Sequence, residues 1–166
     1  MQLQHSINFK APLLSWDIFS SVYNTLIEDA ANYRQSVSAI REIARINKWS
    51  EEQTGEAIEH IQRYVIVITD SLQKITYTGK GFYEMTGYTF EEARGKNPRF
   101  LQGSATNKRS TFHVKEQLAL NATAGTVLEN YRKNGEMYLC KIIIKPITNY
   151  NQQLVNYIAY EQEVAA

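Results

Sequence analysis

The chain has 166 residues, of which 43% are hydrophobic, a size that fits one compact domain with an extension. Its 18 lysines and arginines nearly balance its 17 acidic residues, which disfavours a nucleic-acid surface and a polybasic membrane anchor. A lone cysteine, Cys140, cannot form an internal disulfide, and the sequence has neither a signal-peptide pattern nor an apolar run of membrane-spanning length. We therefore expect a cytoplasmic protein, and the three scattered histidines predict no metal site.

Residues 1–62 are predicted to form a helical extension. Apolar or small residues recur there at alternating steps of four and three, the heptad pattern of a helix with one continuous apolar face. They are Phe19, Tyr23, Leu26, Ala30, Tyr33, Val37, Ile40 and Ala44. We expect Ser15 to cap this helix with Asp17 in its first turn, and Ser50 to form a capping box with Gln53 in a second helix. The pattern leaves open whether these helices cover the chain's own sheet or form a dimer interface.

Residues 63–164 are predicted to form an α+β domain. Strands are expected over Tyr64–Thr69, Lys74–Tyr77, Thr126–Lys133, Glu136–Ile147 and Leu154–Val164. Short helices are expected over Phe82–Met85 and Thr89–Ala93, and a longer one over Thr111–Leu120. Asn134 and Gly135 form the strongest short hairpin signal known from sequence. The expected architecture is a five-stranded antiparallel sheet with short helices on one face and a ligand cavity between the two layers.

Alternation along the last two strands places two distinctive side chains inside the domain. Uncharged residues alternate with Lys141 and Lys145, so Cys140 faces the core, where an inert thiol is favoured over a redox group. Glu161 shares the inner face of the last strand, opposite Asn156. A buried carboxyl group must be neutral or partnered, so Glu161 is either a perturbed functional group or a carboxylate that leans into solvent or pairs with a lysine.

Three stretches of the second half resemble a known family. They are MTGYTFEEARGKNPRFLQG (85–103), ENYRKNGEMYLCKIIIKPI (129–147) and NYIAYEQEV (156–164). The expected order of elements resembles that of a Per-Arnt-Sim (PAS) domain. The first stretch is similar to the light-oxygen-voltage (LOV) branch, whose members are flavin-binding blue-light sensors, whereas the other two are shared by many PAS domains.

The resemblance implies a LOV-like site without its reactive cysteine. In LOV domains the cysteine that follows the motif asparagine forms a light-driven thioether with flavin mononucleotide (FMN). Pro98 occupies that position here and has no nucleophile. Asn97, Arg99 and Gln102 match the residues that hold the ribityl chain and the phosphate, and Lys115 stands where the family has a second phosphate-binding arginine.

The half of the site that would hold the flavin ring departs further from the family. Asn130 matches one of two asparagines that pair with the pyrimidine edge, and Cys140 replaces the second, which removes an amide donor and acceptor. Glu161 replaces the glutamine near N5 and O4 of the ring. A protonated glutamic acid can donate a hydrogen bond as glutamine does, whereas an ionised one would repel the flavin carbonyl groups.

The resemblance implies a small sensory or signalling module with no catalytic residues and with FMN as its candidate cofactor. We expect a ligand or redox event in the cavity to alter the sheet and shift the helices on its outer face. Because the chain ends at Ala166, just past the last strand, its output is expected to be a homodimer contact or a separate effector protein, with neither nucleic acid nor membrane as partner.

Three alternatives stay open on the residues alone. The first is a cofactor-free interaction module, in which Asn97 and Arg99 only cap helices or bridge to acidic residues such as Glu91 and Glu92. The second is an enzyme such as a flavin reductase, for which the sequence holds no catalytic constellation. The third is a haem protein that uses His113, a lone histidine without a second haem signal.

Overall fold

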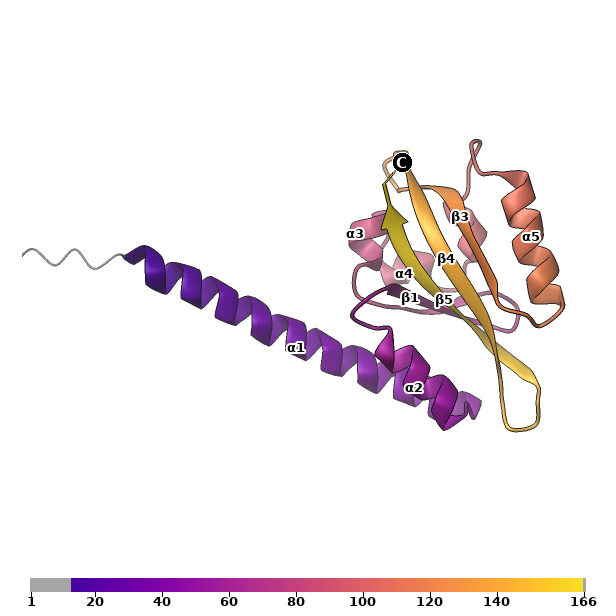
Figure 1. Cartoon of the computed structure of the whole chain (residues 1–166), viewed down its shortest axis with the longest axis horizontal. Helices are drawn as coiled ribbons and strands as arrows, with labels where there is room; N and C mark the ends of the chain where they lie inside the picture. The colour runs from indigo at the N-terminus through magenta and orange to yellow at the C-terminus, as the bar shows by residue number, and fades with distance from the viewer. Residues whose placement is uncertain (1–12, 166) are drawn as a thin grey trace, which may run out of the picture.

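The computed structural model describes residues 13–165, which form two N-terminal helices followed by a mixed domain (Figure 1). The helices are α1 (Leu13–Asn47) and α2 (Glu51–Glu59). The strands of the domain are β1 (Val65–Asp70), β2 (Ile75–Thr78), β3 (Ala124–Tyr131), β4 (Met137–Thr148) and β5 (Leu154–Val164). Between β2 and β3 lie α3 (Phe82–Thr86), α4 (Phe90–Ala93), the 3₁₀ helix η1 (Pro98–Leu101) and α5 (Lys108–Ala119).

The five strands form one antiparallel sheet in the order β2-β1-β5-β4-β3, which confirms the predicted α+β fold. The last strand in the sequence therefore lies in the middle of the sheet. Glu161 of β5 is paired with Val65 of β1 on one side and with Ile142 of β4 on the other. A carboxyl group at this position is flanked by strands on both sides, which limits its access to water.

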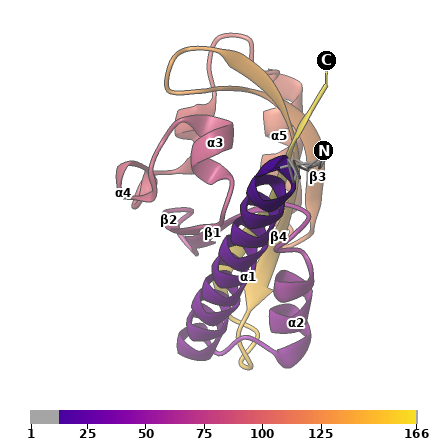
Figure 2. The same cartoon turned by 90° about the vertical axis from the view of Figure 1, so that its left-hand side faces the viewer.

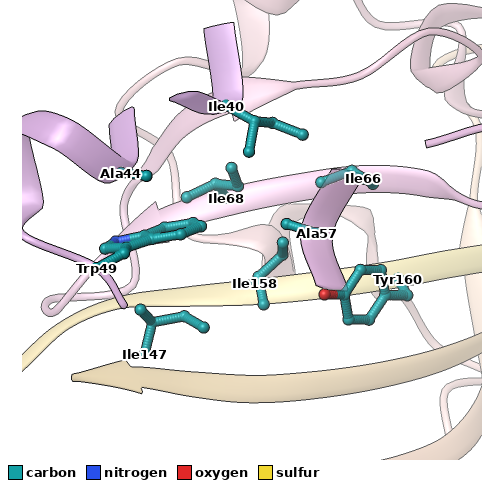
Figure 3. Close-up of a cluster of buried hydrophobic side chains, with 9 residues drawn as sticks. All are labelled: Ile40, Ala44, Trp49, Ala57, Ile66, Ile68, Ile147, Ile158 and Tyr160. Atoms are coloured by element: carbon teal, nitrogen blue, oxygen red, sulfur yellow. The ribbon is translucent and has the colours of Figure 1, made fainter. Parts of the chain in front are cut away.

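The outer face of the sheet is covered by the N-terminal helices of the same chain. Figure 3 shows Ile40 and Ala44 of α1, Trp49 and Ala57 packed over isoleucines of β1, β4 and β5. Side chains of the projecting first half of α1 are exposed from Ile18 to Ala31, and this half extends away from the sheet (Figures 1 and 2). The question of how the helices pack is thus answered for the second half of α1 and for α2, which cover their own sheet.

The two predicted helix starts have different outcomes. Ser50 forms the predicted capping box, since its Oγ accepts a hydrogen bond from Gln53 N at 3.1 Å and its N–H donates to Gln53 Oε1 at 2.8 Å. The prediction for Ser15 is wrong, because α1 begins at Leu13 and has no acidic residue in its first turn.

The inner face of the sheet is covered by the short helices. Phe82, Ala93 and Leu101 from α3, α4 and η1 pack against Val67 and Ile75. At the opposite edge, Leu118 of α5 packs against Ala124 and Tyr157. Neighbouring residues of β1 point to opposite faces, so the continuous burial of Ile66–Thr69 confirms the prediction of a strand covered on both sides.

The β3–β4 connection is longer than the two-residue turn that Asn134 and Gly135 predict. The strands end at Tyr131 and resume at Met137, and Gly135 adopts a φ of 89° within the loop. Lys133 N donates to Thr86 O at 2.9 Å, and the Arg132 guanidinium binds Met85 O and Glu163. Arg132 N still donates to Glu136 O at 2.8 Å, and Gly135 N donates to Arg132 O at 2.9 Å, so residues 133–135 form a three-residue loop.

Candidate functional site

A cavity of about 380 Å3 lies between the inner face of the sheet and the helices η1 and α5. Its volume is in the range of small-molecule sites. The apolar part of the lining comes from β1, η1, α5, β3 and β4, and includes Val67, Leu101, Leu118, Leu128, Ile142 and Ile144. Apolar walls of this kind can bury the apolar part of a small ligand, and the polar groups of the lining determine how such a ligand is oriented.

Three cations line the cavity and are exposed at its mouth. Arg99 comes from η1, and Lys108 and Lys115 come from α5. The two lysines are seven residues apart, so they lie two turns apart on the same side of the helix. Together the three side chains offer a charged rim for an anionic group such as a phosphate.

The η1 segment is held by its own side chains as well as by the core. Asn97 Oδ1 accepts a hydrogen bond from Arg99 N at 3.1 Å, and Asn97 Nδ2 donates to Gln73 Oε1 at 3.3 Å. Pro98 occupies the first turn and lines the cavity, and Gln102 forms a β-bridge with Asn130. Asn97 therefore caps η1, as one alternative predicted.

Arg99 does not form the salt bridges that the cofactor-free alternative predicts. Its predicted acidic partners were Glu91 and Glu92, but Glu92 pairs with Lys133. No salt bridge in the described part of the chain engages Arg99. Its guanidinium group is left at the cavity mouth.

The deep end of the cavity holds two buried polar groups with unsatisfied atoms. Asn130 and Glu161 are each 5% exposed and both line the cavity. Among the described residues, neither Asn130 Oδ1 nor Glu161 Oε2 has a hydrogen-bond partner. Native proteins rarely leave buried polar atoms unpaired, and each such atom costs about 1–3 kcal/mol. The pair therefore indicates a site for a ligand with hydrogen-bonding groups.

Burial also changes the acidity of Glu161. Removal from water disfavours the carboxylate and raises the pKa of this side chain from 4.5 to about 7. No ion pair with Glu161 occurs within residues 18–165, so the alternatives of a solvent-facing or lysine-paired carboxylate are wrong. The group is poised to be neutral below neutral pH and ionised above it.

Cys140 lies in the core beside the cavity. Its side chain is fully buried against Met85, Leu128, Tyr138 and Ile142, and it is not part of the cavity lining. Burial raises the pKa of the thiol well above its usual value, which makes it unreactive. The predicted inward orientation is confirmed, whereas a contact between Cys140 and a cofactor stays a prediction.

The structure brings six of the seven predicted site residues to one cavity: Asn97, Arg99, Gln102, Lys115, Asn130 and Glu161. The sequence analysis missed Lys108, Gln73 and Tyr157, which also line it. Helical spacing from Lys115 identifies Lys108 without coordinates. No group of three or more histidine, cysteine or acidic side chains within the described residues is arranged to hold a metal ion.

A helix-covered antiparallel sheet with a cavity on its inner face defines a ligand-sensing α+β domain. Residues 63–165 match the PAS domain family, and the chain belongs to that family. PAS domains are sensory modules. The predicted PAS domain is thereby confirmed.

The relatives of the chain include blue-light photoreceptors. It is 40% identical over 92 residues to a blue-light photoreceptor of Listeria innocua, a match that covers 54% of this chain and 36% of that protein. It is 31% identical over 143 residues to phototropin-1A of Oryza sativa, covering 85% of this chain and 15% of that protein. The chain thus spans about a third or less of the length of these relatives.

Solved structures of LOV domains share the fold. A LOV domain studied with a flavin analogue superposes with a TM-score of 0.63 at 30% identity, covering 66% of this chain and 85% of that one. The dark structure of the Aureochrome1 LOV domain gives a TM-score of 0.62 at 27% identity, covering 67% of this chain and 82% of that one. Helices long and apolar enough to cross a membrane are absent from the described residues.

Proposed function

We propose that this chain is a LOV-type sensory module that binds FMN non-covalently and signals without a cysteine adduct. The observation that carries the proposal is the pair of unsatisfied atoms, Asn130 Oδ1 and Glu161 Oε2, buried in a cavity whose lining also carries three exposed cations. An amphipathic ligand with a hydrogen-bonding ring and an anionic tail would satisfy both ends. FMN has this chemistry, and the similarity to blue-light photoreceptors supports it.

The cavity residues divide the binding task between them. Arg99, Lys108 and Lys115 would hold the phosphate, and Gln102 would contact the ribityl hydroxyls. Asn130 and a neutral Glu161 would hold the edge of the ring. Bound FMN would supply absorption of blue light and redox chemistry. Pro98 lines the cavity and offers no nucleophile.

The output of the module would pass through the sheet. Glu161 faces the cavity from β5, and its neighbours Ile158 and Tyr160 pack under the N-terminal helices on the outer face. A change in the charge or hydrogen bonding of Glu161 therefore acts on a strand that contacts both layers. We infer that a homodimer contact or a separate effector protein reads the position of α1, and the proposal assigns no catalytic step to the chain.

Purified protein is expected to bind FMN and to show blue absorption with resolved shoulders after reconstitution. Arg99→Ala should weaken FMN binding about 10- to 100-fold, because it removes a charge-assisted contact with the phosphate. Binding of riboflavin, which lacks the phosphate, should change little. Arg94→Ala is the matched control, since Arg94 is exposed at the end of α4 and lies outside the cavity lining. Titration followed by flavin fluorescence measures the affinity of the native protein and of both variants for each flavin. Equal losses of FMN and riboflavin affinity in Arg99→Ala would contradict the phosphate role.

Pro98→Cys is expected to bring light-induced loss of the blue absorption that recovers in the dark. The substitution places a thiol where the LOV resemblance requires one, at a position that lines the cavity. Removing the proline from the first turn of η1 should cost no more than about 1 kcal/mol. Pro98→Ser is the control and should behave as the native protein does. Reversible bleaching of the native protein to the same extent would contradict the adduct-free proposal.

The second candidate function is a cofactor-free interaction module. The exposed apolar side chains of α1 favour it, because such a surface is typical of a protein contact. This candidate also explains Cys140, which stands where the LOV resemblance requires a second ring-binding asparagine. The cysteine is buried in the core and lies outside the cavity lining. A protein that stays colourless after reconstitution with FMN would support this candidate and exclude the first.

A further inference from the structure

The projecting half of α1 carries a row of exposed apolar side chains. Ile18, Val22, Tyr23, Leu26 and Ile27 are each about half exposed or more, and Leu26 reaches 61%. The apolar face of α1 continues along the helix to Ile40 and Ala44, which pack on the sheet. Figure 1 shows that the sheet does not reach the projecting half. An apolar surface of this extent marks an interaction site.

Charge is distributed unequally along the same helix. Residues 18–33 contain two charged side chains, Glu28 and Asp29, and both are acidic. Asp29 pairs with Lys80 of the same chain, whereas no salt bridge among the described residues engages Glu28. Residues 34–48 contain Arg34, Arg41, Arg45 and Lys48 against the single acidic Glu42. The first half of α1 is therefore apolar and acidic, and the second half is basic.

The basic half of α1 presents a partly exposed face of the helix. Tyr33 and Val37 lie on this face with Arg34 and Arg41, and Glu42 and Arg45 lie beside them. Arg45 pairs with Glu42 at 2.7 Å, but no salt bridge within the described residues engages Arg34 or Arg41. An apolar floor with cations beside it fits a helix that presents apolar side chains flanked by carboxylates.

We propose that a second copy of this chain packs antiparallel along α1, so that the apolar, acidic half of each helix lies on the basic half of the other. Two-fold symmetry forms this contact twice, once at each end. Packed helix axes are about 8–10 Å apart, within about one Debye length, so opposite charges attract across the contact. Ala30 and Ala31 lie near the crossing point, where small side chains permit close approach. A parallel pairing would instead align acidic with acidic and basic with basic segments.

This inference rests on the proposed role of α1 as the output surface, and it names the partner of that surface. Dimerisation is measured without flavin, so its failure is distinct from a failure to bind FMN. The native chain is expected to sediment as a dimer, and added salt should weaken the dimer. A monomer at high protein concentration would overturn the proposal, as would a dimer that salt does not weaken.

Leu26→Glu should weaken the dimer about 30-fold or more, because it buries a charge in the centre of the contact. Leu72→Glu is the matched control, since Leu72 is 77% exposed on the β1–β2 turn, far from α1 in the sequence. Sedimentation equilibrium measures both, and circular dichroism verifies that α1 remains helical. Equal dimer affinities for the two variants would overturn the proposal.

Spin labels distinguish the two orientations. Ser20→Cys and Ala31→Cys each add one exposed thiol, while the buried Cys140 stays unlabelled. In the antiparallel dimer the labels at residue 31 lie close together. The labels at residue 20 are about 30 Å further apart. The helix rises about 1.5 Å per residue, and residues 20 and 31 are separated by the same length of helix in each of the two copies. Similar short distances for both sites would indicate parallel helices and overturn the proposed orientation.

Discussion

Replacing Glu161 with glutamine is expected to raise the free energy of unfolding above pH 7 by about 3 kcal/mol, the equivalent of its pKa shift. The native carboxyl group has a pKa raised by burial from 4.5 to about 7. The folded protein therefore holds this proton more tightly than the unfolded chain does. The stabilising contribution is complete below pH 4.5, declines as the pH rises, and is lost above pH 7. Glutamine has a similar shape and stays neutral throughout, so this decline should disappear.

The surroundings of Glu161 explain why ionisation is costly. Burial alone raises the pKa of Glu161. Its titratable neighbours Tyr138 and Cys140 of β4 carry no positive charge, and their own pKa values are raised mainly by burial and further by Glu161. The neighbouring strand residues Val65 and Ile142 are apolar. Among the residues that the structure describes, no ion pair offsets the loss of water around the carboxylate.

Urea denaturation at pH 5 and pH 8 measures the effect. The native protein should lose stability between the two values, and Glu161→Gln should lose much less. Glu116→Gln on the exposed side of α5 serves as the control and should retain the native decline. FMN affinity gives a second readout, because it should fall above pH 7 in the native protein and stay level in Glu161→Gln. An unchanged pH dependence in Glu161→Gln would contradict the buried-carboxyl interpretation.

Local sequence patterns predict most of this fold because its elements are locally determined. The apolar run of β1, the capping box at Ser50 and the alternation along β5 each depend on residues close together in the chain. The β3–β4 loop is one residue longer than predicted, because the left-handed Gly135 ends a three-residue turn that closes on Arg132 O. Contacts between distant residues are absent from local patterns, such as the hydrogen bonds from Arg132 and Lys133 to α3, 47 residues away.

The candidate site, like the fold, was predictable where it depends on consecutive residues and unpredictable where it depends on distant ones. The motif around Asn97 and Arg99 identifies the cationic mouth, because the positions are consecutive and follow a family pattern. The unsatisfied state of Glu161 was not predictable, since it depends on every group that surrounds the carboxyl oxygens in three dimensions. The same holds for Asn156, which was expected on the outer face but lies buried there beneath the N-terminal helices.

Trp49→Ala is expected to lower the free energy of unfolding by about 3–5 kcal/mol, the usual cost of removing a large buried ring. Trp49 is 3% exposed, lies between α1 and α2, and packs on the outer face of the sheet (Figure 3). Its Nε1 donates to Asn156 Oδ1 at 2.9 Å, and Asn156 Nδ2 donates to Thr69 O at 2.9 Å. Since Thr69 lines the cavity, these buried hydrogen bonds connect the cavity wall with the junction of the helices.

Trp49→Phe separates the packing of the ring from its hydrogen bond. Phenylalanine keeps most of the apolar contact but leaves Asn156 Oδ1 unpaired, so about 1–3 kcal/mol should be lost. Tyr150→Ala, at a residue exposed in the β4–β5 loop, should change stability by less than about 0.5 kcal/mol.

Thermal denaturation gives the stabilities, and hydrogen exchange of α1 and α2 measures how firmly the helices are held on the sheet. Because Trp49 lies outside the cavity lining, Trp49→Phe should retain FMN affinity while exchange in both helices accelerates. Unchanged exchange would mean that the apolar cluster alone holds the helices, and the hydrogen-bonded connection through Asn156 would then have no part in carrying a signal from the cavity to α1.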